Sequence, residues 1–136
     1  MDIGRVTEFA GKDNFAKMTG AVIEVISDDE VVCTLSITEN HLNAGGTVQG
    51  GAVFTLADFA FAIASNQDDL KAEIDAISIS QSSSIVFFRP AKGDRLIART
   101  RCLQKGRKIS VYRVTVTDNS GAAVAELTGN AYRIFK

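Results

Sequence analysis

The sequence predicts an α+β fold in which a curved antiparallel sheet of five to six strands wraps around one apolar helix. A strand pattern opens the chain, changes once to a long apolar helical segment, and returns for the whole second half. The later strands are joined by short turns, which exclude the long crossovers that a parallel sheet requires. No linker rich in proline, glycine or charge divides the chain, so we predict one domain over residues 1–136.

The individual strands are predicted from alternation and from turn residues. Before the helix, residues 31–37 have apolar side chains at every odd position and mostly polar ones between them, and 27–30 turns this segment back on 21–26. After the helix, we expect strands at 76–88, 95–103, 108–118 and 122–135, with turns at 89–94, 105–106 and 119–121. A short helix before Lys17, capped by Asp13, is also expected.

The composition argues against several classes of partner. With 15 basic against 16 acidic residues, the net charge of −1 offers no field for nucleic acid or an anionic membrane. One histidine and two distant cysteines cannot assemble a zinc site, so we expect neither metal nor cofactor. The first fifteen residues lack a signal-peptide pattern, and the apolar stretch 51–64 is shorter than the roughly 20 residues that span a bilayer. A cytoplasmic protein is therefore expected.

The predicted helix carries one ionisable side chain. Residues 51–66 are mostly apolar, and Asp58 is the only ionisable group among them. A helix that is apolar all round is expected to be buried. Because a lone carboxylate is costly to take out of water, Asp58 needs a reason to be there, and contact with a substrate is the simplest. The alternative is that Asp58 faces a wet gap or pairs with an Arg or Lys of the sheet.

A glycine-rich segment, 41–51, leads into this helix. Its backbone N–H groups point outward at the helix N-terminus and form a site for an anion, unless the segment is only a flexible connection with a glycine cap. Asp58 follows Gly50 by eight residues, which places them ~12 Å apart along one helix. One reacting carbonyl group cannot touch both. We therefore predict an active site between two subunits whose helices lie antiparallel.

Three linked motifs resemble the PaaI-type, or phenylacetate-degradation, branch of the hotdog-fold acyl-CoA thioesterases. The first is Asn43 followed by glycines up to Gly51, the second is the helix pattern that ends in Asp58, and the third is the turn 88–94, which reads FRPAKGD. The similarity covers most of residues 20–136. One position departs from the family pattern, because Gln49 stands where the family has a His before two glycines.

The resemblance implies a hotdog dimer, usually assembled into a tetramer, that hydrolyses acyl-CoA without a metal. By position, Asp58 corresponds to the nucleophile or general base, Asn43 to the residue that places the water or the thioester, and Gly50 to the donor for the thioester oxygen. Gln49 and Gly51 would lie beside the substrate. Either Ser80 or Ser82 falls where the family often has a hydroxyl near the carboxylate.

Other residues are candidates for substrate contacts. His41 either lines the mouth of the site or is structural. The basic residues near two turns are candidates for the phosphates of coenzyme A, although each on its own is more often a solvated charge: they are Arg89, Lys92 and Arg95, and Lys105, Arg107 and Lys108. The apolar helix and Phe87–Phe88 suggest an aryl or medium-chain acyl group. The alternatives are a hotdog hydratase or dehydratase, and a non-catalytic acyl-CoA-binding protein.

Overall fold

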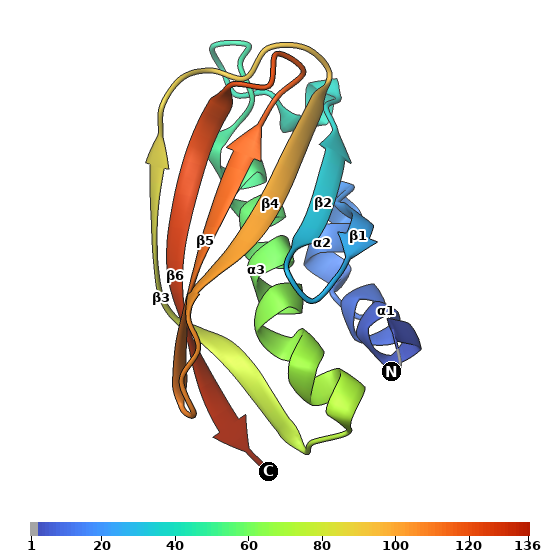
Figure 1. Cartoon of the computed structure of the whole chain (residues 1–136). Coiled ribbons are helices and arrows are strands. Elements are labelled where there is room, and N and C mark those ends of the chain that lie inside the picture. Colours follow the sequence, from blue (N-terminus) through green and yellow to red (C-terminus); the bar gives the residue numbers. More distant parts are fainter. Residues whose placement is uncertain (1–2) are drawn as a thin grey trace.

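A six-stranded antiparallel sheet curves around one long helix in the computed structural model, which describes residues 3–136 (Figure 1). The strand order is β1-β2-β4-β5-β6-β3. In chain order the elements are α1 (Ile3–Gly11), α2 (Asn14–Thr19), β1 (Val22–Ile26), β2 (Val31–Ser36), a 3-10 turn η1 (Glu39–His41), α3 (Gly50–Ala72), β3 (Ala76–Phe87), β4 (Arg95–Gln104), β5 (Ile109–Thr117) and β6 (Ala123–Phe135). The predicted fold class is confirmed. Residues 1 and 2 of the predicted domain lie outside the described residues.

The core lies between the concave face of the sheet and α3. Leu56, Phe61 and Ile63 of α3 are almost completely buried there. The ring of Phe61 meets that of Tyr112 on β5 edge-on, with 5.8 Å between the ring centroids. Gly129 on β6 leaves room for this contact, because a Cβ at that position would lie 3.0 Å from Phe61 Cε1. This packing holds α3 in one position against the sheet.

Helix α3 is longer than the sequence pattern predicts. It begins at Gly50 and ends at Ala72, whereas the apolar pattern ends at Asn66. The additional turns are held by polar contacts: the Asn66 side chain bonds the backbone N–H and carbonyl of Ser78, and Gln67 donates to the Ser27 carbonyl. An apolar pattern cannot reveal amides that are buried by hydrogen bonding to a neighbouring strand.

The prediction that α3 is buried all round is wrong. The sheet covers one side of the helix, and α1 and α2 pack beside it (Figure 1). A strip at helical spacing remains exposed or half-exposed, and it consists of Gly51, Thr55, Asp58, Ala62 and Ser65. One curved sheet and two short helices do not enclose the whole circumference of a helix. We call these five residues the open strip of α3.

The N-terminal segment forms two helices where one was predicted. Asp13 caps α2 as expected, since its Oδ1 accepts a hydrogen bond of 3.0 Å from the Ala16 N–H. Helix α1 was not predicted, and it is anchored by the buried side chains of Val6 and Ala10. Among residues 3–136, no helix combines the length and the apolar character needed to cross a membrane.

Candidate active site

The approach to α3 is an ordered turn. Asn43 Oδ1 accepts hydrogen bonds from the N–H groups of Gly45 and Thr47, and its Nδ2 donates to Thr47 Oγ1. The Asn43 N–H also donates to the Thr47 carbonyl over 2.7 Å. The Asn43 side chain therefore shapes the loop, as Asn commonly does through bonds to its own neighbouring backbone. The predicted glycine cap is wrong, because the N-cap of α3 is Gln49, while a catalytic role for Asn43 stays a prediction.

The first N–H of α3 has an internal acceptor. Gln49 is the N-cap, and its Oε1 accepts a 3.0 Å hydrogen bond from the Gly50 N–H. The Gln49 backbone is held in turn, because its N–H donates to the His41 carbonyl over 2.7 Å. Gly51 N–H has no acceptor among residues 3–136. One of the two predicted donors is thus open, and a bound oxygen could take the other by displacing the Gln49 side chain.

Asp58 is half-buried on the open strip of α3 and is unpaired. It makes no hydrogen bond or ion pair with any of residues 3–136, so the predicted alternative of a pairing with a sheet cation is wrong for this part of the chain. The other predicted alternative, that Asp58 faces a wet gap, stays a prediction. Burial raises the pKa of the Asp58 carboxyl, and the nearby negative charge of Asp13 raises it further. An unpaired carboxylate with a raised pKa is a typical candidate for a general base.

Within one chain, the helix keeps Asp58 away from the glycine N–H groups. Gly50 and Asp58 both lie in α3 and are eight residues apart, or ~12 Å along the helix axis. The structure does not bring them together within one subunit. A complete site with both features therefore requires a second copy of the chain.

A β-bulge in strand β3 decides which serine faces the helix. The register shifts between Ser80 and Ser82, and Ser80 Oγ lies 2.9 Å from Ser83 Oγ. Ser83 Oγ in turn lies close to Gly129, beside the ring of Phe61 on α3. Ser80 and Ser83 therefore face the helix. Ser82, which pairs with Asn130 after the register shift, points to the opposite face of the sheet. The sequence did not indicate Ser83, because a bulge changes the alternation on which that prediction rested.

His41 has structural contacts at both ring nitrogens. Its Nδ1 accepts a 2.9 Å hydrogen bond from the Thr38 N–H and closes a capping box around η1. Nε2 must then carry the proton, and it donates to the Thr19 carbonyl over 2.6 Å. The ring thus joins η1 to the end of α2, which favours the structural reading of His41. It also leaves no free ring nitrogen for the acid–base chemistry of a hydratase.

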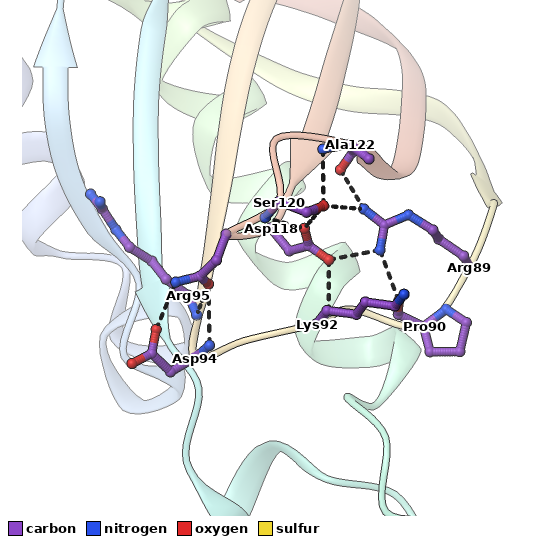
Figure 2. Close-up of polar contacts among 9 residues, drawn as sticks. Arg89, Pro90, Lys92, Asp94, Arg95, Asp118, Ser120 and Ala122 are labelled. Carbon is purple, nitrogen blue, oxygen red and sulfur yellow. Dashed lines mark hydrogen bonds and ion pairs between the residues drawn. The ribbon is translucent and has the colours of Figure 1, made fainter.

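Arg89 lies in a polar network that fastens the turn after β3 to the end of β5 (Figure 2). Its guanidinium donates to Asp118 Oδ2 over 2.7 Å, and also to the Pro90 carbonyl, Ser120 Oγ and the Ala122 carbonyl. Asp118 additionally accepts from the Lys92 N–H over 2.6 Å. The Arg89 side chain is therefore already engaged, which argues against its predicted role in holding phosphate.

Asp118 is the buried centre of this network, with 1% of its surface exposed. The Arg89 guanidinium holds the pKa of this carboxyl well below its usual range, and hydrogen bonds from Ser120 and from the Lys92 N–H add to the effect. No motif or periodicity in the sequence singled out Asp118. The only available signal was its position at a strand end, which many solvated turn residues share.

The Lys92 side chain is exposed and remains available to a ligand.

Two grooves flank the start of α3. One, of about 510 Å³, is lined by exposed apolar residues of α2, including Phe15 and Met18, and by Gln49, Gly51 and Phe54. The other, of about 300 Å³, is lined by Gly50 and by Phe87, Phe88 and Arg89 of the β3 end. Residues 3–136 contain no group of three or more His, Cys, Asp or Glu side chains that could hold a metal ion.

A helix wrapped by a curved antiparallel sheet, with a carboxylate on the helix and glycines at its tip, defines the hotdog class of enzymes. The comparisons agree, since the model of the thioesterase superfamily matches residues 45–125. The acyl-coenzyme A thioesterase PaaI of Escherichia coli is 34% identical over 125 residues, which cover 90% of this chain and 84% of that protein. The chain belongs to the thioesterase superfamily and, within it, to the PaaI-type branch.

Solved structures support the same assignment. The structure of E. coli PaaI superposes with a TM-score of 0.86 at 28% identity, and the match covers 96% of this chain and 91% of that one. A Streptococcus mutans protein solved with bound acetyl-CoA has a TM-score of 0.76 at 27% identity, with 86% and 90% of the two chains covered. The predicted fold and family are confirmed, and membership of this family supports the predicted thioester hydrolase.

Proposed function

We propose that this protein hydrolyses acyl-CoA thioesters with an aryl or medium-chain acyl group, using Asp58 as its catalytic carboxylate. The observation that carries the proposal is the state of Asp58, which is half-buried, unpaired among residues 3–136, and located on the open strip of α3. E. coli PaaI, at 34% identity, is named an acyl-coenzyme A thioesterase, and the S. mutans relative was solved with acetyl-CoA. Both names agree with an acyl-CoA substrate, while the aryl or medium-chain acyl group is part of the proposal.

The proposed active site forms between two subunits whose α3 helices pack antiparallel. If Gly50 and Gly51 of one helix lie beside Asp58 of the other, the two-fold axis passes close to Phe54 and Thr55. The small side chains of the open strip support this arrangement, because they permit close approach of two helices. Edge strand β3 exposes Val86, Phe87 and Ile79, which offer further apolar surface for the dimer and for assembly into a tetramer.

In the proposed mechanism, the thioester carbonyl oxygen accepts hydrogen bonds from the Gly50 and Gly51 N–H groups of one subunit. The Gln49 side chain leaves the Gly50 N–H when substrate binds, and its amide then lies beside the carbonyl. Asp58 of the other subunit either removes a proton from an attacking water or attacks the carbonyl carbon itself. The C–S bond then breaks, and the coenzyme A thiolate takes up a proton, from Asp58 when Asp58 acts as the base and from solvent when Asp58 attacks. In the second case, water then hydrolyses the Asp58 acyl anhydride, which releases the acid and restores the carboxylate. The N–H groups stabilise the negative charge that develops on the oxygen.

The other predicted residues have supporting roles in this proposal. Asn43 holds the loop that aims the glycine N–H groups, and Ser80 provides the hydroxyl on the helix side of β3. Lys92 stays a candidate for a substrate contact at the turn after β3, whereas Arg89 stabilises that turn. The apolar groove beside Gly51 provides space for the acyl group. The proposed reaction uses no metal or cofactor, and the proposal retains a cytoplasmic setting.

Release of free thiol from a panel of aryl- and medium-chain acyl-CoAs tests this function. We expect steady turnover of at least one class, with no loss of activity in the presence of a metal chelator. Stabilisation by acyl-CoA without release of thiol would instead indicate a non-catalytic binding protein. Consumption of an enoyl-CoA by hydration, with its thioester intact, would indicate the hydratase alternative.

The shared site predicts that a bulky charge at the centre of the open strip disrupts both assembly and activity. We expect Thr55→Arg to convert the dimer to a monomer and to remove most thioesterase activity, because two buried guanidinium groups would face each other at the axis. Sedimentation velocity and thiol release measure the two effects. Thr7→Arg, on exposed α1, is the matched control. A Thr55→Arg protein that stays dimeric and active would contradict the shared site.

A further inference from the structure

The two groups of basic residues predicted to contact phosphate, one at the turn after β3 and one at the β4–β5 turn, differ in how many of their charges are already paired. Near the turn after β3, Arg89 pairs with Asp118 and Arg95 pairs with Glu24, which leaves Lys92 as a single exposed cation there. At the β4–β5 turn, Lys105 pairs with Asp68. Arg107 and Lys108, on the same turn, form no ion pair with a carboxylate of residues 3–136, and both are exposed. They are two adjacent cations without a counter-ion.

Both cations converge on one aromatic ring. The Arg107 guanidinium carbon lies 5.2 Å from the centroid of the Phe135 ring, and Lys108 Nζ lies 5.3 Å from it. Lys108 Nζ also lies 5.9 Å from the ring of Tyr132. Cation–π contacts explain why these side chains fold onto β6 rather than extend into water. The repulsion between the two positive charges remains, and a bound anion would relieve it.

The backbone that presents Arg107 and Lys108 is tightly held. Gly106 has no room for a side chain, because a Cβ there would collide with the Ile109 carbonyl oxygen. The Gly106 N–H donates to Ser110 Oγ, and the Lys108 carbonyl accepts from the Arg133 N–H over 2.7 Å. An ordered turn lowers the entropy lost when its side chains bind a ligand.

Two acidic residues of α3 near this turn, Asp68 and Asp69, are already paired with basic residues. Arg133 also lies over Phe135, at 4.3 Å, but it is paired with both carboxylate oxygens of Asp69. Asp68 is occupied by Lys105. Asp68 and Asp69 are therefore compensated, and Arg107 and Lys108 keep their positive charges without a paired carboxylate among residues 3–136.

We propose that Arg107 and Lys108 bind the phosphoryl groups of the coenzyme A portion of the substrate, an inference that rests on the proposed function. Phosphoryl oxygens are strong acceptors for guanidinium and ammonium groups. The cations belong to the subunit that contributes Asp58 and Ser80. The nucleotide end of the substrate would lie at the lower end of the sheet in Figure 1, beside the last residues of β6.

The register of β3 and β6 gives the path between the two ends of the substrate. Ser80 is paired with Ala131, and Ala76 is paired with Phe135. Four residues of strand span ~13 Å, a distance that the flexible pantetheine arm can follow along β3. Phe135 faces the same side of the sheet as Ser80, since Arg133, two residues before it, pairs with Asp69 of α3. The thioester and the phosphates can thus lie on one face.

Thioesters with and without the nucleotide test the assignment. The combined variant Arg107→Ala and Lys108→Ala is assayed with one acyl group carried on coenzyme A and on N-acetylcysteamine. We expect KM for the acyl-CoA to rise about ten- to hundredfold, the range for lost hydrogen bonds to a charged group, with kcat unchanged. The KM for the N-acetylcysteamine thioester should stay the same.

Adenosine 3′,5′-bisphosphate should compete with acyl-CoA in the native protein far better than inorganic phosphate does, and should lose this advantage in the variant.

A matched control removes two other exposed cations, Arg101 on β4 and Lys12 after α1, by Arg101→Ala and Lys12→Ala. This control should retain the native KM for acyl-CoA. An unchanged KM in the Arg107 and Lys108 variant, or an equal rise for both thioesters, would overturn the phosphate assignment. If the native protein hydrolyses neither thioester, the proposed function fails. Calorimetric titration with adenosine 3′,5′-bisphosphate then still decides whether Arg107 and Lys108 bind it.

Discussion

Asp58→Asn is expected to lower kcat for acyl-CoA hydrolysis by about 10³-fold, within the range for loss of a general base. The amide cannot accept a proton from water, nor can it attack the thioester as a carboxylate would. The side chain keeps its size, so the α3 packing around it should be unchanged. Thiol release under saturating acyl-CoA, compared between the native protein and the variant, measures the effect.

The same substitution should not destabilise the fold. Burial raises the pKa of the Asp58 carboxyl in the folded state, while the ordinary value of ~3.9 applies in the unfolded state. At a pH between these two pKa values, the folded state therefore binds more protons than the unfolded state. Stability contributed by this group therefore falls as pH rises through that window. Asp58→Asn removes this penalty, and we expect an equal or higher thermal midpoint at neutral pH. In the native protein, kcat/KM should rise with pH through the raised pKa.

A structural role for Asp58 would give a different pattern. If Asp58→Asn lowered the thermal midpoint and the activity together, loss of fold would explain the lost turnover. If turnover survived unchanged in a stable variant, the catalytic assignment would be wrong. Asp75→Asn, at an exposed position between α3 and β3, is a suitable control and should retain native kcat.

Asp118→Ala is expected to produce the largest loss of stability, about 3 kcal/mol in the free energy of unfolding. This is the lower end of the range for removing one partner of a buried ion pair. We choose the lower end because the Arg89 side chain is 26% exposed and can be partly solvated once its partner is gone. The Lys92 N–H and the Ser120 N–H lose their acceptors as well. Urea denaturation followed by circular dichroism measures the change.

The pH dependence of this effect has the opposite sign to that of Asp58. The pKa of Asp118 is lowered in the folded state, first by Arg89 and then by Ser120 and the Lys92 N–H. Its stabilisation is therefore fully present above the ordinary carboxyl pKa of ~3.9 and is lost as pH falls below it. The stability difference between the native protein and Asp118→Ala should shrink in acid. A variant with the native urea midpoint at pH 7 would show that this network does not stabilise the turn.

Much of the fold could be predicted from the sequence because its signals are local. Alternation over 31–37 and the turn residues 27–30 specify a hairpin through neighbouring side chains and backbone preferences. The apolar helix, the glycine approach and the turn 88–94 are also contiguous in the chain, and together they were sufficient for the family. Asp58 stood out for the same reason, as a single charge in an apolar segment.

The arrangement of the site depends on contacts between segments far apart in the chain. The bulge in β3 turns Ser80 toward α3, the backbone of Ser78 holds Asn66, and Asp118 pairs with Arg89 from another turn. None of these contacts leaves a periodic signal in either segment by itself. The open strip of α3 could not be predicted either, because the hydrophobicity of a helix does not state how much of its surface one sheet can cover.

The sequence by itself therefore determined the class of fold, the family and the candidate carboxylate, since each follows from residues close together in the chain. The tertiary structure decided which charges are already paired and which remain free. Arg89 and Arg107 look alike as basic residues beside a turn, but Arg89 pairs with Asp118, whereas Arg107 lies over an aromatic ring and pairs with no carboxylate of residues 3–136. The availability of a charge depends on what the folded chain places next to it, and such neighbours are set by packing over long sequence separations.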